Sequence, residues 1–165
     1  MDKFIQGYRD FKGNDHKDIN FESMGEGQQP EVMVVTCCDS RIELSKLLKA
    51  NFGELFVVRN VANIIPPYEC DDRHHGTSAA LEAGVKFFNV KHIVIMGHSG
   101  CGGIGVLREN KQTTDFVGSW MDNVADLMKK YPDADAEFIE KENVKLGLGR
   151  LLDYPWIKDP VDKGE

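Results

Sequence analysis

The chain has 165 residues, of which 28% are charged and 41% hydrophobic, and its formal net charge is −7. This length is typical of one domain, predicted here to span residues 1–165, and such a domain buries about two thirds of its unfolded surface. The acidic balance argues against nucleic-acid and anionic-membrane partners, because both bind through clustered Lys and Arg side chains. The apolar runs are also too short to span a membrane.

Cysteine usage bears on the cellular compartment. Cysteines stand at positions 37, 38, 70 and 101, and they form no CxxC pair. The chain starts with the polar run Met1, Asp2 and Lys3 rather than with an apolar export signal. Unpaired thiols in a chain without such a signal are typical of a reducing compartment. We therefore expect a cytoplasmic protein.

The first element expected is an amphipathic helix over 2–12. Its apolar side chains recur at helical spacing: Phe4, Ile5, Tyr8 and Phe11. We expect this apolar stripe to pack on a neighbouring surface. The polar, glycine-containing stretch 14–29 that follows is predicted to be a loop.

The next part of the chain alternates between strand and helix patterns. Short apolar runs rich in β-branched residues predict strands covered on both faces: 31–36, 55–58 and 92–96. Helical patterns lie between them, over 43–50 and 77–88. The alternation predicts an α/β fold with a mostly parallel sheet flanked by helices. We expect this core over 30–110, followed by further helices over 113–158.

Two segments offer metal ligands, and each follows a predicted strand. Cys37 follows the first strand, whereas His98 and Cys101 follow the third. In open parallel sheets, ligands bind beyond the carboxyl ends of the strands. Two thiolates and one imidazole match the preference of Zn²⁺ for sulfur and nitrogen, and they leave one tetrahedral position open. The segments therefore predict a catalytic zinc site at the carboxyl edge of the sheet.

Asp39 and Arg41 stand close to Cys37 in the sequence. Zinc lowers the pKa of a coordinated water from about 16 toward about 7. Asp39 is near enough to take the fourth metal position, or to accept a hydrogen bond from a hydroxide there. In an extended segment Arg41 lies on the same side as Asp39 and can hold that carboxylate away from the metal. We interpret the pair as a switch between open and closed zinc.

A simpler interpretation treats Cys37 and Cys101 as buried small hydrophobic residues and His98 as a hydrogen-bonded core histidine. For any one of these residues alone, that interpretation is the more common outcome. The joint arrangement at strand ends along one edge of a parallel sheet favours the metal site instead.

These segments resemble the β-class carbonic anhydrases. The family's CxDSR motif matches residues 37–41, of sequence CCDSR, and its HxxC motif matches residues 98–101, of sequence HSGC. The likeness covers nearly the whole chain. Further segments that look like family sequence are GQQP at 27–30, FVVRNVAN at 56–63, PPY at 66–68, HGTSAALE at 75–82 and YPW at 154–156.

The resemblance implies an enzyme that reversibly hydrates carbon dioxide to bicarbonate through attack by zinc hydroxide. It implies one Zn²⁺ per chain, bound by Cys37, His98 and Cys101, and a catalytic dyad of Asp39 and Arg41, with Asp39 as the fourth ligand in a closed state. It also implies a substrate pocket shared across a dimer interface, so we expect a homodimer or homotetramer. The substrate-binding residues carried over by position are Gln28, Phe56, Val61 and Gly102, the last through its N–H.

The chain departs from the family pattern at three places. Ala83 replaces an aromatic pocket residue, Val34 stands where bicarbonate-regulated members carry tryptophan, and the sequence stops at Glu165, before the usual further edge strand. We therefore expect a larger pocket, an open zinc without the regulatory anion site, and a sheet without that strand.

Two alternative functions remain open at this point. One is hydrolysis of carbonyl sulfide or carbon disulfide by the same zinc hydroxide, for which the change at Ala83 leaves room. The other is a structural or redox-sensing zinc protein in which Asp39 closes the site permanently.

Overall fold

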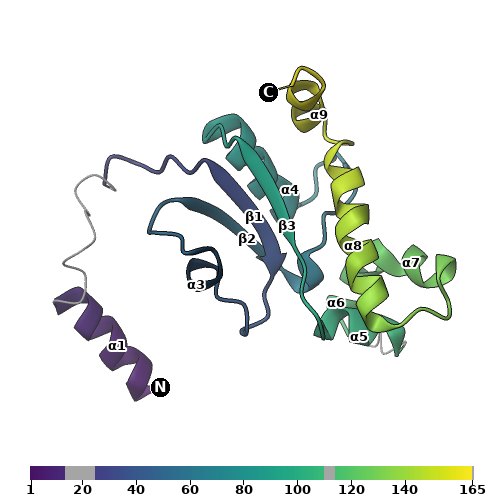
Figure 1. Ribbon diagram of the computed structural model, residues 1–165, viewed down its shortest axis with the longest axis horizontal. Helices are drawn as coiled ribbons and strands as arrows, with labels where there is room; N and C mark the ends of the chain where they lie inside the picture. The colour runs from purple at the N-terminus through teal and green to yellow at the C-terminus, as the bar shows by residue number, and fades with distance from the viewer. Residues whose placement is uncertain (14–24, 110–113, 165) are drawn as a thin grey trace.

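Three parallel strands form the centre of the structure, a computed structural model that describes residues 1–13, 25–109 and 114–164. The strand order is β2-β1-β3, and helices pack on the sheet (Figure 1). This arrangement confirms the predicted α/β fold with a parallel sheet flanked by helices. The strands are β1 (Val32–Cys37), β2 (Leu55–Asn60) and β3 (His92–Met96).

Helices connect the strands and continue after the last one. The α-helices are α1 (Asp2–Gly13), α3 (Leu44–Leu48), α4 (Gly76–Glu82), α5 (Gly102–Arg108), α6 (Val117–Met121), α7 (Ala125–Lys130), α8 (Ala136–Leu151) and α9 (Pro155–Asp162). Shorter turns are the 3-10 segments η1 (Val61–Asn63) and η3 (Asp122–Val124) and the π-helical segment η2 (Ala83–Phe87). Of the expected loop, residues 14–24 lie outside the described chain, as does residue 113 of the expected helical region.

The single helix predicted over 77–88 is divided at Ala83, where α4 passes into the wider π-helical turn η2. Gly84 lies in this turn and is buried. A Cβ atom at Gly84 would overlap the terminal methyl group of Met33, so a larger residue at this position would require the Met33 side chain to move. This close approach places the turn against the sheet.

The two faces of β1 bury different side chains, because successive residues of a strand point in opposite directions. Val34 packs in a cluster with residues of α5 to α8, whereas Met33 and Val35 pack in a cluster with residues of α4 and α9. The prediction that each strand is covered on both faces is correct for β1. It is wrong for the outer strands β2 and β3, in which Val57 and Val94 are 42% and 40% exposed. Each outer strand has a neighbouring strand on one side only within the described chain.

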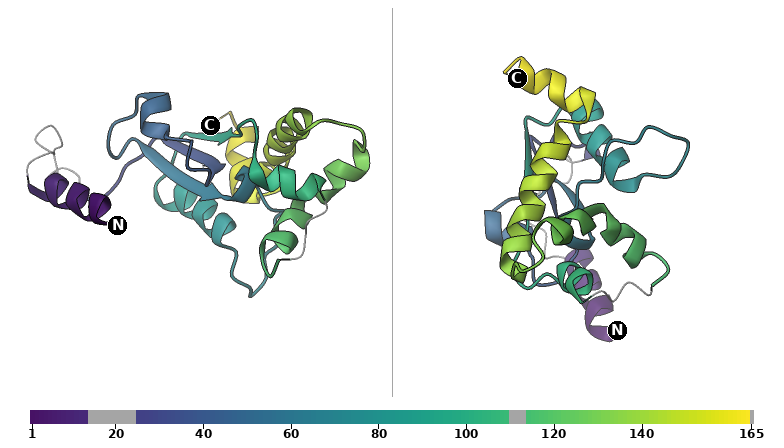
Figure 2. Two further views of the ribbon diagram at one scale, coloured as in Figure 1. Left: turned by 90° about the horizontal axis from the view of Figure 1, so that it is seen from below. Right: turned by 90° about the vertical axis from the view of Figure 1, so that its right-hand side faces the viewer.

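Helix α1 forms where the spacing predicted it, but it lies apart from the sheet (Figures 1 and 2). Phe4 and Tyr8 are 74% and 65% exposed. The ring of Phe11 lies 6.4 Å from that of Phe52, in the turn before β2. The expected packing of the whole apolar stripe on a neighbouring surface is therefore not made within the described part of this chain.

Helix α8 supports the carboxyl edge of the sheet. It contacts β3, α5 and α7, and it runs beside the sheet in Figures 1 and 2. Its residue Ile139 is fully buried in the same cluster as Cys37 and Cys101. Residues separated by more than a hundred positions in the sequence therefore share one core around the predicted metal ligands.

Truncation of Ile139 should destabilise the protein. Ile139→Ala leaves a cavity in a packed core, and such changes cost about 2–5 kcal/mol of unfolding free energy. Leu148→Ala removes a side chain of the same helix that is 51% exposed and should cost less than half as much. Urea unfolding at a constant m-value measures both losses. Equal losses would contradict the packing of α8 described here.

Candidate metal centre

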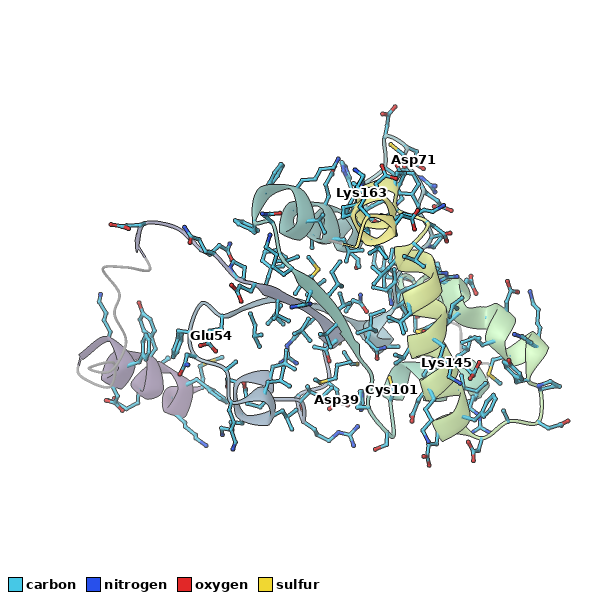
Figure 3. The ribbon with its side chains drawn as sticks, turned by 45° about the horizontal axis from the view of Figure 1, so that its top comes forward. Asp39, Glu54, Asp71, Cys101, Lys145 and Lys163 are labelled. Carbon is cyan, nitrogen blue, oxygen red and sulfur yellow. The ribbon has the colours of Figure 1, made fainter. Side chains whose placement is uncertain are left out.

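The two segments predicted to bind metal meet at one edge of the sheet. Parallel pairing sets Thr36 of β1 opposite Met96 of β3, so the segments that leave these strands start side by side. Cys37 ends β1, and His98 and Cys101 lie between β3 and α5. One ligand atom from each of the three residues lies within 4.8 Å of the others. Both cysteines are only 5% exposed, and Figure 3 shows Cys101 close to Asp39 at this edge.

The orientation of His98 fits a metal ligand. Its Nδ1 lies 3.0 Å from the carbonyl oxygen of Ser99, which can only accept, so Nδ1 carries the proton. The other ring nitrogen, Nε2, then presents its lone pair. Nε2 is buried and has no hydrogen-bond partner. A buried polar atom without a partner is costly, and a zinc ion bound at Nε2 would satisfy it.

Backbone N–H groups surround the two thiols. Those of Asp39 and Ala62 lie near Cys37, and those of Gly103 and Ile104 lie near Cys101, where each favours the thiolate form. Burial is the largest influence on Cys37 and opposes ionisation, but the surrounding polar groups, including the nearby backbone N–H groups, together lower its pKa. Burial raises the pKa of Cys101 to about 11. A bound divalent cation would favour the thiolate form of both residues.

Asp39 is held by Arg41 beside the cluster. The Asp39 Oδ1 atom accepts from the backbone N–H and Nε of Arg41, each at 2.9 Å, and Oδ2 accepts from the Arg41 Nη2 at 2.8 Å. The same Nη2 donates to the carbonyl oxygen of Gly100 at 3.0 Å, which ties the two metal-binding segments together. Asp39 Oδ2 lies 3.8 Å from His98 Nε2. Hydrogen bonds from the Arg41 side chain hold the pKa of Asp39 well below its usual range.

The four predicted substrate-binding residues fall into two groups. Val61 directly follows β2, and Gly102 begins α5, so both lie at the metal edge. Phe56 is the second residue of β2, pairs with Met33 and stacks near Phe88 at 5.3 Å between ring centroids. Four residue steps along β1 lead from Met33 to Cys37, a distance of about 13 Å. Gln28 is exposed and precedes β1, also toward the end remote from the cluster.

The structure adds two site residues that the sequence reasoning missed. Glu140 of α8 is buried, and its Oε1 accepts from the backbone N–H of Cys101 at 2.8 Å. Asn143 of α8 is also buried, and its Nδ2 donates to the carbonyl oxygen of Ala62 at 2.8 Å. The sequence offered one local sign of these residues, because Glu140 and Asn143 are polar residues at helical spacing among the apolar residues of α8. Nothing in the sequence indicates their hydrogen-bond partners, which lie 39 and 81 positions away.

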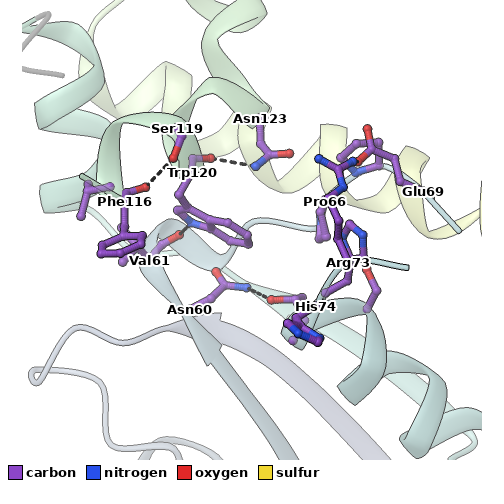
Figure 4. Close-up of a pocket in the computed structure, with 16 residues that line it drawn as sticks. Asn60, Val61, Pro66, Glu69, Arg73, His74, Phe116, Ser119, Trp120 and Asn123 are labelled. Carbon is purple, nitrogen blue, oxygen red and sulfur yellow. Dashed lines mark hydrogen bonds and ion pairs between the residues drawn. The ribbon is translucent and has the colours of Figure 1, made fainter. Parts of the chain in front are cut away.

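A cavity of about 700 Å³ opens beside the metal edge (Figure 4). Asn60 and Val61 form one wall, and His74 and Arg73 lie across from them. The indole Nε1 of Trp120 donates to the carbonyl oxygen of Val61 at 2.8 Å and so fixes this wall. The cavity places polar and aromatic side chains next to the turn that follows β2.

The fold and the site together define an α/β protein with a Cys-His-Cys metal cluster at the carboxyl edge of a parallel sheet. Residues 32–165 match the family model described as carbonic anhydrase. The chain is 33% identical to "Beta carbonic anhydrase 3" of Arabidopsis thaliana over 180 aligned positions, which cover 100% of this chain and 69% of that protein. The chain therefore belongs to the β-carbonic anhydrase family, which confirms the predicted family and enzyme class.

Solved structures show the same relationship. The β-carbonic anhydrase CcaA superposes with a TM-score of 0.88 at 28% identity, covering 99% of this chain and 85% of that one. One of two β-carbonic anhydrases described as tetrameric, from Sordaria macrospora, gives a TM-score of 0.78 at 28% identity, covering 98% and 82%. The fold of the whole described chain is therefore that of the family.

Zinc content should depend on Cys37 and not on its neighbour Cys38. Cys37→Ala removes one of three clustered ligands, so the variant should lose most of the zinc that the unmodified protein carries, expected at one ion per chain. Cys38→Ala is the matched control, because Cys38 is exposed and lies outside the cluster. Elemental analysis of the dialysed proteins measures zinc per chain. An equal loss in the two variants would contradict the assigned site.

Proposed function

We propose that this protein catalyses the zinc-dependent reversible hydration of carbon dioxide to bicarbonate and a proton. The cluster of Cys37, His98 and Cys101 beside Asp39 carries the proposal, and family membership supports it. Zinc, when bound, supplies a Lewis acid that ionises water near neutral pH. The remaining chemistry belongs to side chains and backbone groups of this chain.

Asp39 orients the attacking oxygen in this proposal. Its carboxylate remains ionised because Arg41 lowers its pKa, so it accepts a hydrogen bond instead of donating one. Arg41 fixes the carboxylate through both oxygens, and its further bond to Gly100 fixes the guanidinium. A nucleophile that donates its proton toward Asp39 presents a lone pair to the carbon atom of the substrate. Asp39 is thus assigned as a hydrogen-bond acceptor rather than as a proton shuttle.

Substrate binding is assigned to two sets of groups. The N–H of Gly102 belongs to the first turn of α5, where N–H groups have no partner within the helix, and we assign it to a substrate oxygen. Val61 supplies an apolar wall at the same edge. Gln28 and Phe56 lie toward the opposite end of the sheet, so we assign them to the site of a second copy of the chain.

A homodimer or homotetramer follows from that assignment. The proteins from Sordaria macrospora are described as tetrameric, which supports assembly of this chain as well. Among the described helices, none has the length and apolar character needed to cross a membrane. The exposed free thiols of Cys38 and Cys70 support a reducing compartment, and we propose the cytoplasm.

The geometry favours an open site over a permanently closed one. Both carboxylate oxygens of Asp39 accept hydrogen bonds from Arg41, and this pairing would have to be disrupted before Asp39 became a permanent metal ligand. The structural or redox alternative is therefore disfavoured. No contact at Ala83 favours a sulfur-containing substrate over carbon dioxide, so carbon dioxide is the proposed substrate.

Replacement of Asp39 should separate catalysis from metal binding. Asp39→Asn keeps the three clustered ligands but puts an amide where the anionic acceptor stood, so turnover should fall at least about 100-fold while zinc content stays unchanged. Stopped-flow hydration of carbon dioxide, normalised to bound zinc, measures the effect. The control is Asp126→Asn, which alters an exposed carboxylate paired with Lys129. Full activity of Asp39→Asn per zinc would show that the assigned role is wrong.

The pH dependence of activity should follow the ionisation of water and not the ionisation of Asp39. Activity per zinc should rise between about pH 6.5 and pH 9, because zinc-coordinated water ionises near pH 7. Asp39 should add no step to this profile, since its lowered pKa keeps it ionised throughout and its contribution is lost only in strong acid. Stopped-flow measurements across this range test both statements. Activity that falls as the pH rises would contradict hydroxide attack.

A further inference from the structure

Helix α8 reaches the Cys101 segment and the turn after β2 through two buried polar side chains. Glu140 and Asn143 are 7% and 3% exposed and lie three positions apart, hence on one face of the helix. Glu140 accepts from the N–H of Cys101, and Asn143 donates to the carbonyl oxygen of Ala62, both at 2.8 Å. One helical face therefore contacts the backbone on both sides of the cluster.

Each of these contacts leads to a metal-binding sulfur. Glu140 holds the backbone of Cys101 itself. Asn143 holds Ala62, whose backbone N–H lies beside the Cys37 thiol in the same buried cluster. Ala62 has φ of 62°, a left-handed conformation that is unfavourable for a residue with a side chain. Such a turn persists only where surrounding contacts hold it, and the Asn143 amide provides one of them.

The position of α8 along the sheet is itself fixed by close packing. A Cβ atom on Gly147 would approach Ile95 Cδ1 to 3.0 Å and Ile65 Cγ1 to 3.2 Å, so the helix lies against these side chains with little space. Arg150, one turn later, donates to the carbonyl oxygens of Ile65 and Asn123 at 2.9 and 2.6 Å. These contacts oppose sliding or rotation of the helix. Glu140 and Asn143 are therefore presented from a rigid element.

A carboxylate at the buried position 140 carries a desolvation cost. Burial of a charged or polar group destabilises the folded state unless hydrogen bonds compensate it. An apolar residue at position 140 would pack without that cost but would leave the N–H of Cys101 unpaired. The interaction that the carboxylate makes in return is with the backbone of a predicted metal ligand.

We propose that Glu140 and Asn143 are positioning residues that hold Cys101 and, through Ala62, Cys37 in the geometry that binds the metal. This inference rests on the proposed function, because it assumes that the cluster binds zinc. Neither residue is assigned contact with substrate. Their effect should appear first in metal affinity and in the rate of metal release, before any effect on turnover is considered.

The direct test compares zinc release from variants at position 140. Glu140→Met keeps side-chain length but removes the acceptor, so release of zinc to a chromogenic chelator should become about 10- to 100-fold faster, with a matching loss of affinity. Glu140→Gln keeps an acceptor oxygen and should stay within about 3-fold of the unmodified protein. Glu137→Met is the matched control, since Glu137 is an exposed residue of the same helix, paired with Lys141.

A thermodynamic comparison distinguishes positioning from ordinary structural support. Zinc stabilises the folded protein according to its affinity, so the difference in melting temperature between zinc-loaded and metal-free protein reports the coupling. Glu140→Met should reduce this difference, whereas a merely structural role would lower both melting temperatures equally. Asn143→Leu should reduce the difference in the same way and gives an independent test if Glu140→Met does not fold.

The outcomes separate the two proposals. Unmodified protein that binds zinc, together with Glu140→Met and Asn143→Leu that release it at the unmodified rate, would overturn the positioning role and leave the proposed function standing. Glu140→Gln that fails as badly as Glu140→Met would overturn the assignment to a hydrogen-bond acceptor. Unmodified protein that binds no zinc at this cluster would overturn the proposed function and this inference with it.

Discussion

The parallel pairing of β1 with β3 is the constraint on which the rest of the structure depends. Because the two strands run in the same direction and are in register at Thr36 and Met96, the segments that follow them leave the sheet side by side. Antiparallel pairing would send these segments to opposite ends of the sheet. The hydrophobic cover of β1 on both faces stabilises this pairing. The packing of the core therefore sets the distance between Cys37 and Cys101, because it fixes the sheet from whose strands both segments leave.

Around this edge, hydrogen bonds set the electrostatic character of the site. Backbone N–H groups favour the charged form of each buried thiol, against a burial effect that opposes it. Arg41 does the same for Asp39 and also joins the two segments through Gly100. Two buried side-chain nitrogens of the described residues have no hydrogen-bond partner, Asn63 Nδ2 and His98 Nε2. Of these, only His98 Nε2 belongs to the cluster with Cys37 and Cys101, and it marks the place where a metal ion fits.

The positions of the four predicted substrate-binding residues explain why assembly and activity are linked in the proposal. Val61 lies at the metal edge, whereas Gln28 and Phe56 lie toward the other end of the same sheet. No bend of a packed strand brings these groups together within one chain, since β1 is fully buried over most of its length. Apolar side chains on α1 and on the outer strands remain exposed as well. A second copy of the chain could cover these exposed apolar side chains and place its Gln28 and Phe56 near the metal edge of the first.

Local pattern was sufficient for the strands, for most helices and for the gathering of Cys37, His98 and Cys101 at one edge of the sheet. Apolar runs in the sequence indicate directly which segments are buried. Residues that follow parallel strands must lie at the same edge of the sheet. The division of the helix at Ala83, the exposure of α1 and the contacts of Glu140 and Asn143 were decided only in three dimensions. Each depends on how closely distant elements pack, as Gly84 does on Met33 and α8 on β3. Such contacts leave no local signature, because the free energy that favours them belongs to the pair of surfaces and not to either segment alone.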